Sequence, residues 1–141
     1  MDVSFSAFTT ANQNPAQSER IRFEGVISNE GFHYNPGDSI FTCPYEAIYF
    51  FSYSFYGILA NLELTTGRLM KNNDIMIEAY CRVESSDAVY LQCSNSAILY
   101  CEENQQVYLA ASDGNTVILA SGPKTTFSGF MINANVSFTT K

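Results

Sequence analysis

The chain of 141 residues lacks tryptophan altogether and has one histidine, His33. Cations are also scarce, because 7 Lys and Arg face 14 Asp and Glu and leave a formal net charge of −7. This negative field argues against nucleic acid as the main partner, and equally against an anionic membrane surface. No run approaches the roughly 18–20 apolar residues of a membrane-spanning helix, so membrane insertion is not expected. At this length we expect one domain, residues 1–141, with a core of its own.

Catalytic motifs are missing as well. The sequence contains no Gly-x-Ser-x-Gly elbow, no phosphate-binding glycine loop and no His-Glu-x-x-His motif. His33 stands between Phe32 and Tyr34, a neighbourhood that favours a core or interface residue over a general base. We therefore predict a protein without enzymatic activity.

The four cysteines are Cys43, Cys81, Cys93 and Cys101. None forms a Cys-x-x-Cys pair, and a single histidine leaves little for a zinc site. Two disulfides in any of three pairings remain open, and so do four free buried thiols. Cys81 and Cys93 flank an acidic loop and are the first candidates for a disulfide, because neighbouring antiparallel strands can bring their Cα atoms within about 7 Å.

Apolar and polar residues alternate along much of the chain with the period of two that is typical of β-strands. The strongest segment runs from Phe41 to Tyr56 and predicts one long strand. No segment has helical periodicity, and turn sequences such as Asn35–Asp38, Lys71–Asp74 and Asp113-Gly114 separate short runs. The pattern predicts an all-β sandwich or jelly roll. Further strands are predicted at residues 3–7, 20–24, 62–65, 75–83, 89–93, 97–101, 107–111, 116–120, 125–133 and 136–139.

The last long strand, Thr126–Ile132, is apolar on both faces. Phe127, Gly129 and Met131 point one way on a strand, whereas Ser128, Phe130 and Ile132 point the other way. A strand of this kind must be covered on both sides. We expect the second covering surface to be another copy of the same chain.

Nine short segments, taken in their order along the chain, resemble the globular head of the complement C1q family, a jelly roll related to the tumour necrosis factor fold. The resemblance covers residues 3–133 and leaves 134–141 as a short C-terminal extension. No Gly-X-Y collagen repeat precedes the head, so a head-only member or an isolated head is expected. The segments that carry the resemblance are Phe5–Ala7, Ile21–Glu24, Phe32–Pro36, Ile40–Pro44, Ile48–Phe51, Leu69–Asn73, Ser94–Leu99, Val107–Leu109 and Phe127–Phe130.

The resemblance implies a C1q/TNF-like jelly-roll β-sandwich of about ten antiparallel strands that forms a homotrimer. It also implies that Cys43 is a free, buried thiol on the aromatic strand. Aromatic residues at matching positions are expected in the core or the subunit interface. These are Phe5, Tyr49, Phe51, Tyr108, Phe127 and Phe130.

In several members of the family, the loop that matches residues 84–87 lies near the apex of the trimer and supplies calcium ligands. The resemblance therefore makes Glu84, Asp87 and Gln92 candidate ligands of Ca²⁺, a cation that needs several hard oxygens. A plain solvated acidic loop is the competing interpretation. Asn135 begins an Asn-Val-Ser glycosylation sequon, which matters if the protein is secreted.

By resemblance, the expected function is recognition: a secreted, lectin-like innate-immune trimer that binds microbial surface glycans. A secreted ligand for a host protein receptor and a structural or adhesive trimer are the alternatives. Residues 1–5 show no basic region followed by an apolar core, so no signal peptide is visible and the expectation of secretion comes from the resemblance.

Overall fold

The computed structural model describes residues 2–59, 64–84, 86–112, 117–120 and 122–133. This part of the chain contains no helix and therefore no helix long and apolar enough to cross a membrane. Its strands are β1 (Ser4–Phe8), β2 (Gly25–Glu30), β3 (Tyr34–Asn35), β4 (Ile40–Thr42), β5 (Ala47–Leu59), β6 (Leu64–Lys71), β7 (Asp74–Arg82), β8 (Val89–Cys101), β9 (Gln106–Ala111), β10 (Val117–Ile118) and β11 (Thr126–Asn133).

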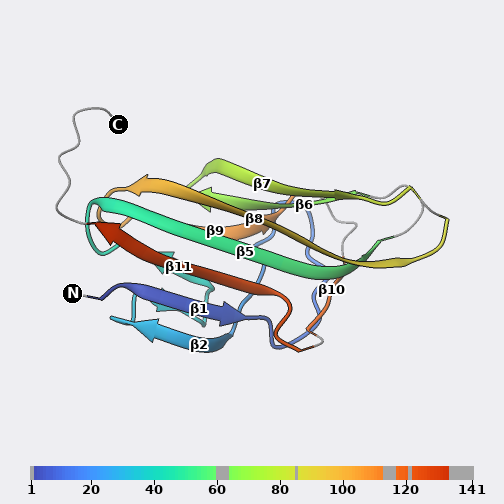
Figure 1. Cartoon of the computed structure of the whole chain (residues 1–141), viewed down its shortest axis with the longest axis horizontal. Helices are drawn as coiled ribbons and strands as arrows, with labels where there is room; N and C mark the ends of the chain where they lie inside the picture. The colour runs from blue at the N-terminus through green and yellow to red at the C-terminus, as the bar shows by residue number, and fades with distance from the viewer. Residues whose placement is uncertain (1, 60–63, 85, 113–116, 121, 134–141) are drawn as a thin grey trace.

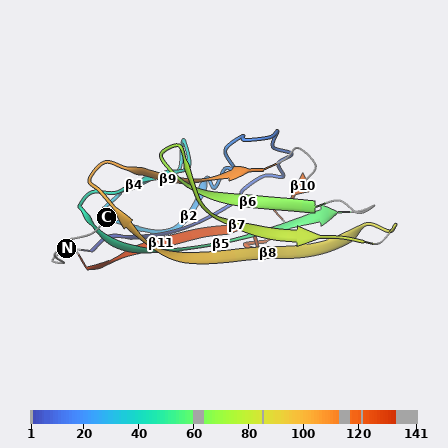
Figure 2. The same ribbon diagram turned by 90° about the horizontal axis from the view of Figure 1, so that it is seen from above.

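The strands form two antiparallel sheets, which confirms the predicted sandwich (Figure 1). The front sheet has the order β8, β5, β11, β1, β2 from top to bottom in Figure 1, and β10 pairs with β5 beyond the start of β11. The back sheet has the order β3, β4, β9, β6, β7. Figure 2 shows the two sheets as layers with the core between them.

The core is built from the inward positions of both sheets, as the alternation predicts. Along β5, buried and half-buried residues alternate without a break from Ala47 to Leu59. Phe5 stacks on Tyr34 and Phe41 with ring centroids 4.7 and 5.0 Å apart, and Phe127 meets it edge-on at 4.9 Å. Four of the six predicted core or interface aromatics lie in this core and are at most 2% exposed: Phe5, Tyr49, Phe51 and Phe127.

The single strand predicted from Phe41 to Tyr56 is wrong. The chain leaves the back sheet after β4, crosses at residues 43–46 and enters the front sheet as β5. Pro44, which has no backbone N–H to donate, lies in the crossing. The alternation of apolar residues in the sequence continues through the crossing, although Tyr45 there is exposed, so the sequence pattern alone does not reveal the corner.

Other boundaries also differ from the predictions. Residues 89–101 form the single strand β8, which pairs with β5 along its whole length from Ala47↔Cys101 to Leu59↔Val89. Ile21 and Phe23 are buried but lie in the connection that precedes β2. The turns at Asn35–Asp38 and Lys71–Asp74 are confirmed. The predicted strand at 136–139, the Asp113-Gly114 turn and Asn135 lie outside the described residues.

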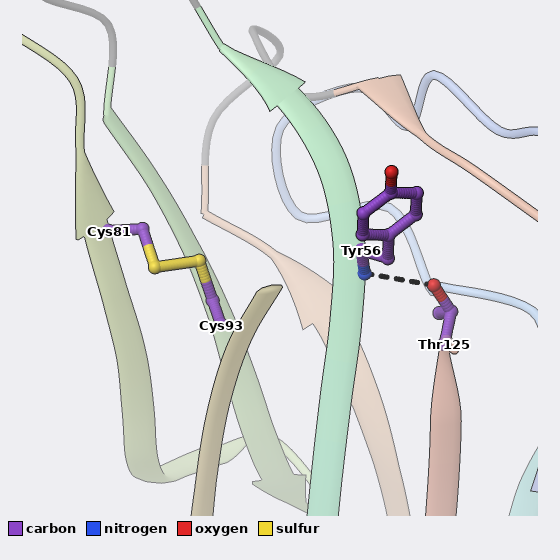
Figure 3. Close-up of a disulfide and its surroundings, with 4 residues drawn as sticks. All are labelled: Tyr56, Cys81, Cys93 and Thr125. Carbon is purple, nitrogen blue, oxygen red and sulfur yellow. Dashed lines mark hydrogen bonds between the residues drawn. A yellow bond between two sulfur atoms is a disulfide. The ribbon is translucent and has the colours of Figure 1, made fainter. Parts of the chain in front are cut away.

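A disulfide between Cys81 and Cys93 joins the two sheets at their shared edge (Figure 3). The Cα atoms are 6.1 Å apart. The cysteines were expected on neighbouring paired strands, but β7 and β8 belong to different sheets and the bridge spans the sandwich.

A hydrogen bond also ties β5 to the start of β11 within the front sheet. The backbone N–H of Tyr56 donates to Thr125 Oγ1 at 2.9 Å (Figure 3).

Candidate functional site

The outer face of the front sheet carries an exposed apolar cluster at one end, formed by Ile48, Phe50, Ile98 and Phe130. Phe50 on β5 is the register partner of Ile98 on β8 and of Phe130 on β11. Ile98 is 64% exposed and Phe130 is 46% exposed, although the two rings of Phe50 and Phe130 pack against each other at 5.4 Å. The cluster leaves apolar surface open to solvent in the single chain.

The middle of the same face is a row of serines. The registers place one serine on each of five strands side by side, and the hydroxyls of Ser6 and Ser128 lie 3.0 Å apart. Because serine side chains are short, they project little from the sheet, and a second surface can approach its backbone closely. The row consists of Ser96, Ser52, Ser128, Ser6 and Ser28.

The far end of the face is aromatic and carries one cation. The ring of Tyr56 stacks on Tyr90 at 5.9 Å, and the Lys124 ammonium lies 4.8 Å from the Tyr56 ring centroid. Gln92, a predicted calcium ligand, lies on β8 beside Tyr56 and donates from Nε2 to the Lys124 carbonyl at 2.8 Å. The structure thus ties the Gln92 amide to a neighbouring backbone group on the sheet face.

The other two predicted calcium ligands, Glu84 and Asp87, lie in the connection between β7 and β8 and are exposed. The carboxylate of Glu84 pairs with Arg82 at 3.5 Å. Within the described ranges, no three His, Cys, Asp or Glu side chains come together in a way that could hold a metal ion. The loop of a single chain therefore provides two carboxylates, which are too few to hold a calcium ion by themselves.

Tyr108 does not share the surroundings of the other five predicted aromatics. Its neighbours Val107 and Leu109 take the inward positions of β9, so Tyr108 lies on the outer face of the back sheet. There its hydroxyl donates to the Asn72 carbonyl at 2.8 Å, and the Arg20 guanidinium lies 5.3 Å from the ring centroid. Tyr108 therefore lies outside the core, and its predicted place in a subunit interface stays a prediction.

The two cysteines outside the disulfide, Cys43 and Cys101, are both fully buried, in keeping with the free, buried thiol expected at Cys43. A hydrogen bond to Cys101 raises the pKa of the Cys43 thiol, and burial raises it further. Cys43 therefore stays a neutral thiol inside the core. Neither residue carries accessible nucleophilic chemistry.

The alternation along β5 and β11 indicates which residues share the outer face, but the exposed residues of β8 were not predicted to lie there. Ile98 and Tyr90 sit at outward positions of a strand that was predicted as two shorter ones. With two short strands, their shared face with Phe50 could not be inferred.

Comparison with known proteins links this arrangement to one family. The C1q domain model matches residues 4–132. A complement C1q subcomponent from Bos taurus is 33% identical over 132 residues, and its counterpart from Mus musculus is 30% identical over 132 residues. Each alignment covers 92% of this chain, which spans about half (51%) of either relative. Caprin-2 from Danio rerio is 31% identical over 131 residues, which are 14% of its length.

Solved structures agree on the fold. The globular domain of zebrafish complement 1qA superposes with a TM-score of 0.75 at 18% identity, covering 94% of this chain and 99% of that one. Murine APRIL gives 0.77 at 9% identity, covering 94% of this chain and 100% of that one. Eiger TNF from S. frugiperda gives 0.77 at 10% identity, covering 99% and 98%. The two-sheet jelly roll and the match over nearly the whole chain show that this protein belongs to the C1q domain family.

Proposed function

We propose that this domain is a non-enzymatic recognition module that assembles into a homotrimer through the outer face of the front sheet. The observation that carries the proposal is the exposed apolar cluster around Phe50, Ile98 and Phe130. Apolar surface gathered on one face marks an interaction site. A closed three-fold ring covers such a face in every copy and leaves no open end for further association.

The charge distribution supports the same face. Each chain has a formal charge of −7, so three copies together carry 3 × −7 = −21. Charged groups near a contact would add repulsion and a desolvation cost. The outward positions of β5, β8 and β11, however, contain no Asp, Glu, Lys or Arg. Contact through these positions therefore adds little charge repulsion, and the nearest carboxylate is that of Glu46, which accepts a hydrogen bond from the Tyr100 hydroxyl.

The proposed ligand is a microbial surface glycan, bound outside the cell. Membership of the C1q domain family and similarity to complement C1q subcomponents support a recognition role. The Cys81–Cys93 bridge suits an oxidising, extracellular environment. Three equal copies of every surface loop would add weak single-site contacts through avidity.

Calcium is proposed as a second component of the trimer. Glu84 and Asp87 give each chain a pair of carboxylates in one exposed connection. Ca²⁺ takes 6–8 oxygen ligands, more than one chain offers, so the site would draw on more than one copy. A bound cation would also offset the repulsion between the acidic loops.

Two measurements on the intact protein test the proposal. Light scattering coupled to size exclusion at low micromolar concentration should give the mass of three chains, and a clean monomer would refute the assembly. A glycan array, probed with and without a chelator, should show binding that free sugar competes. Binding to a host protein that is indifferent to sugar would instead favour the receptor-ligand alternative.

A further inference from the structure

A polar hollow of about 160 Å³ opens in the long connection between β1 and β2. The connection that lines it bonds to β9 and β10 and runs away from the outer face of the front sheet (Figure 2). A trimer built on the front sheet would leave all three copies of the hollow open. Its lining residues are Asn12, Gln13, Asn14, Pro15, Glu19 and Arg22.

Hydrogen bonds to strands hold the walls of the hollow in place. Gln13 exchanges two backbone hydrogen bonds with Ile118 of β10, both 2.8 Å long. The backbone N–H of Ala111 on β9 donates to the Glu19 carbonyl at 2.9 Å. The Gln13 side chain crosses to Arg22, donating to its carbonyl and accepting from its N–H, each at 2.8 Å. The hollow is therefore preformed, which lowers the entropy cost of binding.

Arg22 is the uncommitted cation of the described chain. Of the six cationic side chains there, the other five all have partners: a backbone carbonyl, an aromatic ring or a carboxylate. The Arg22 guanidinium has none, and it forms no ion pair with Glu19 in the same hollow. An unneutralised guanidinium favours a carboxylate or phosphate as its ligand. The five committed cations are Arg20, Arg68, Lys71, Arg82 and Lys124.

The remaining lining groups favour hydroxyls. Asn12 Oδ1 accepts from the Ala120 N–H at 2.8 Å, so its amide nitrogen is left as a donor. Glu19 Oε1 accepts from the Ala16 N–H at 2.7 Å, and its second oxygen has no partner among the described residues. The Asn14 amide forms no side-chain hydrogen bond within the same part of the chain. Donors and acceptors of this kind match the hydroxyl groups of a sugar.

We infer that this hollow binds one carboxylated sugar residue, such as a single hexuronic acid in an otherwise neutral glycan, because the net charge of −7 disfavours a polyanion. Arg22 would take the sugar carboxylate in a bidentate pair, and Asn12, Asn14 and Glu19 would bond its hydroxyls. The Glu19 carboxylate disfavours a phosphate, because a dianion has no hydroxyl protons to offer it and would be repelled. The volume equals about five waters at ≈30 Å³ each, which suits a single sugar ring. The inference rests on the proposed glycan recognition and names the sugar class and its site.

Galacturonate and its methyl ester, which lacks the charge, are the probes. Both are titrated into the full chain and followed by calorimetry and by amide NMR shifts at residues 12–22. A chelator is present throughout, because uronates bind calcium. The free acid should bind at least tenfold more tightly than the ester. Arg22→Gln should weaken acid binding by roughly tenfold and leave ester binding unchanged, as expected for the loss of one charge-assisted pair.

Arg68→Gln is the matched control, since it removes the same charge from the back sheet and should change neither affinity. Equal binding of the acid by wild type and Arg22→Gln would overturn the inference. So would inorganic phosphate that shifts residues 12–22 as strongly as the acid does. If the array detects glycans while Arg22→Gln binds every acidic one normally, the hollow is wrong and the recognition function stands. If the wild type binds neither array nor acid, both fail.

Discussion

Gly129 on β11 lies directly against Phe51 on β5. A Cβ built on Gly129 would be 2.6 Å from Phe51 Cδ1 and 2.8 Å from Phe5 Cε1 on the other side. Both rings are fully buried, so neither can move into solvent. The absence of a side chain at position 129 allows three neighbouring strands to close over the core.

Gly129→Ala should therefore lower the free energy of unfolding by about 1–3 kcal/mol, because an added methyl group forces rings off their rotamers. Chemical denaturation followed by tyrosine fluorescence measures the change. Gly37→Ala is the control, since its nearest neighbour is the flexible Asn35 side chain at 3.2 Å in an exposed turn. Equal losses for both variants would contradict the packing explanation.

Phe130→Glu should convert the trimer to a monomer. It places one carboxylate of each copy in the apolar cluster, where burial without a partner is costly. Light scattering gives the mass, and circular dichroism checks that the monomer is folded. Ile75→Glu on β7, half exposed on the back sheet, should leave the trimer intact. A trimer that survives Phe130→Glu would rule out this face.

Calcium should raise the melting temperature of the wild type, because it would bind only the folded trimer. Asp87→Asn should remove most of that gain by taking away one carboxylate charge, whereas Glu102→Gln should not. Magnesium is a further control, since it tolerates loose, oxygen-rich sites poorly. If chelated and calcium-loaded wild type melt at the same temperature, the acidic connection is ordinary surface.

Stability should fall in alkaline solution because of buried tyrosines. Burial raises the pKa of Tyr34, Tyr49 and Tyr53 above the usual value of about 10. The folded state thus holds protons that the unfolded state releases above about pH 10, and stability present below that pH is lost as pH rises. Each tyrosine contributes a slope of up to about 1.4 kcal/mol per pH unit.

Tyr53→Phe isolates one of these contributions. It should cost about 1–3 kcal/mol at pH 8, because the Gly67 carbonyl loses the hydroxyl that donates to it at 2.8 Å. Between pH 10 and 11.5, however, its stability should fall less steeply than that of the wild type. Guanidinium titrations at four pH values measure both effects, and parallel slopes would show that Tyr53 does not contribute.

Reduction should destabilise the protein at the edge where β7 meets β8. Opening a bridge between residues separated by 12 positions should cost about 2–3 kcal/mol, because it frees the unfolded chain. Alkylation of denatured, unreduced protein followed by mass spectrometry should label Cys43 and Cys101 only. A label on Cys81, or none on Cys43, would show a different pairing.

The alternation of side chains was enough to sort the residues of β11 onto two faces, but both faces are apolar, and only the structure shows that Phe127 and Gly129 lie inside and Phe130 outside. It failed at the corner between β4 and β5, since both strands face one core and the period of two runs through the crossing. At Tyr108 the alternation is right, because Val107 and Leu109 point inward and Tyr108 points outward, where it contacts Arg20 and Asn72.

The polar hollow could not be predicted because its walls come from distant parts of the chain. Residues 12–18 read as an ordinary polar loop, and their conformation depends on Ile118 and Ala111, about a hundred residues away. The availability of Arg22 is equally invisible in the sequence, since it depends on which acidic side chains the fold brings within reach of its guanidinium. Surfaces of assembly are also hard to predict from one sequence, because the surface that covers them belongs to another copy of the chain.

The pairing of β1 with β11 also constrains how the chain reaches its native state. Ser6 and Ser128 are separated by 122 positions, yet β1 has its place in the front sheet only when β11 lies between it and β5. Topologies with such distant contacts fold slowly, because loop-closure entropy must be overcome first. During synthesis β1 must therefore wait until β11 emerges, with Phe5 and its apolar neighbours exposed in the meantime.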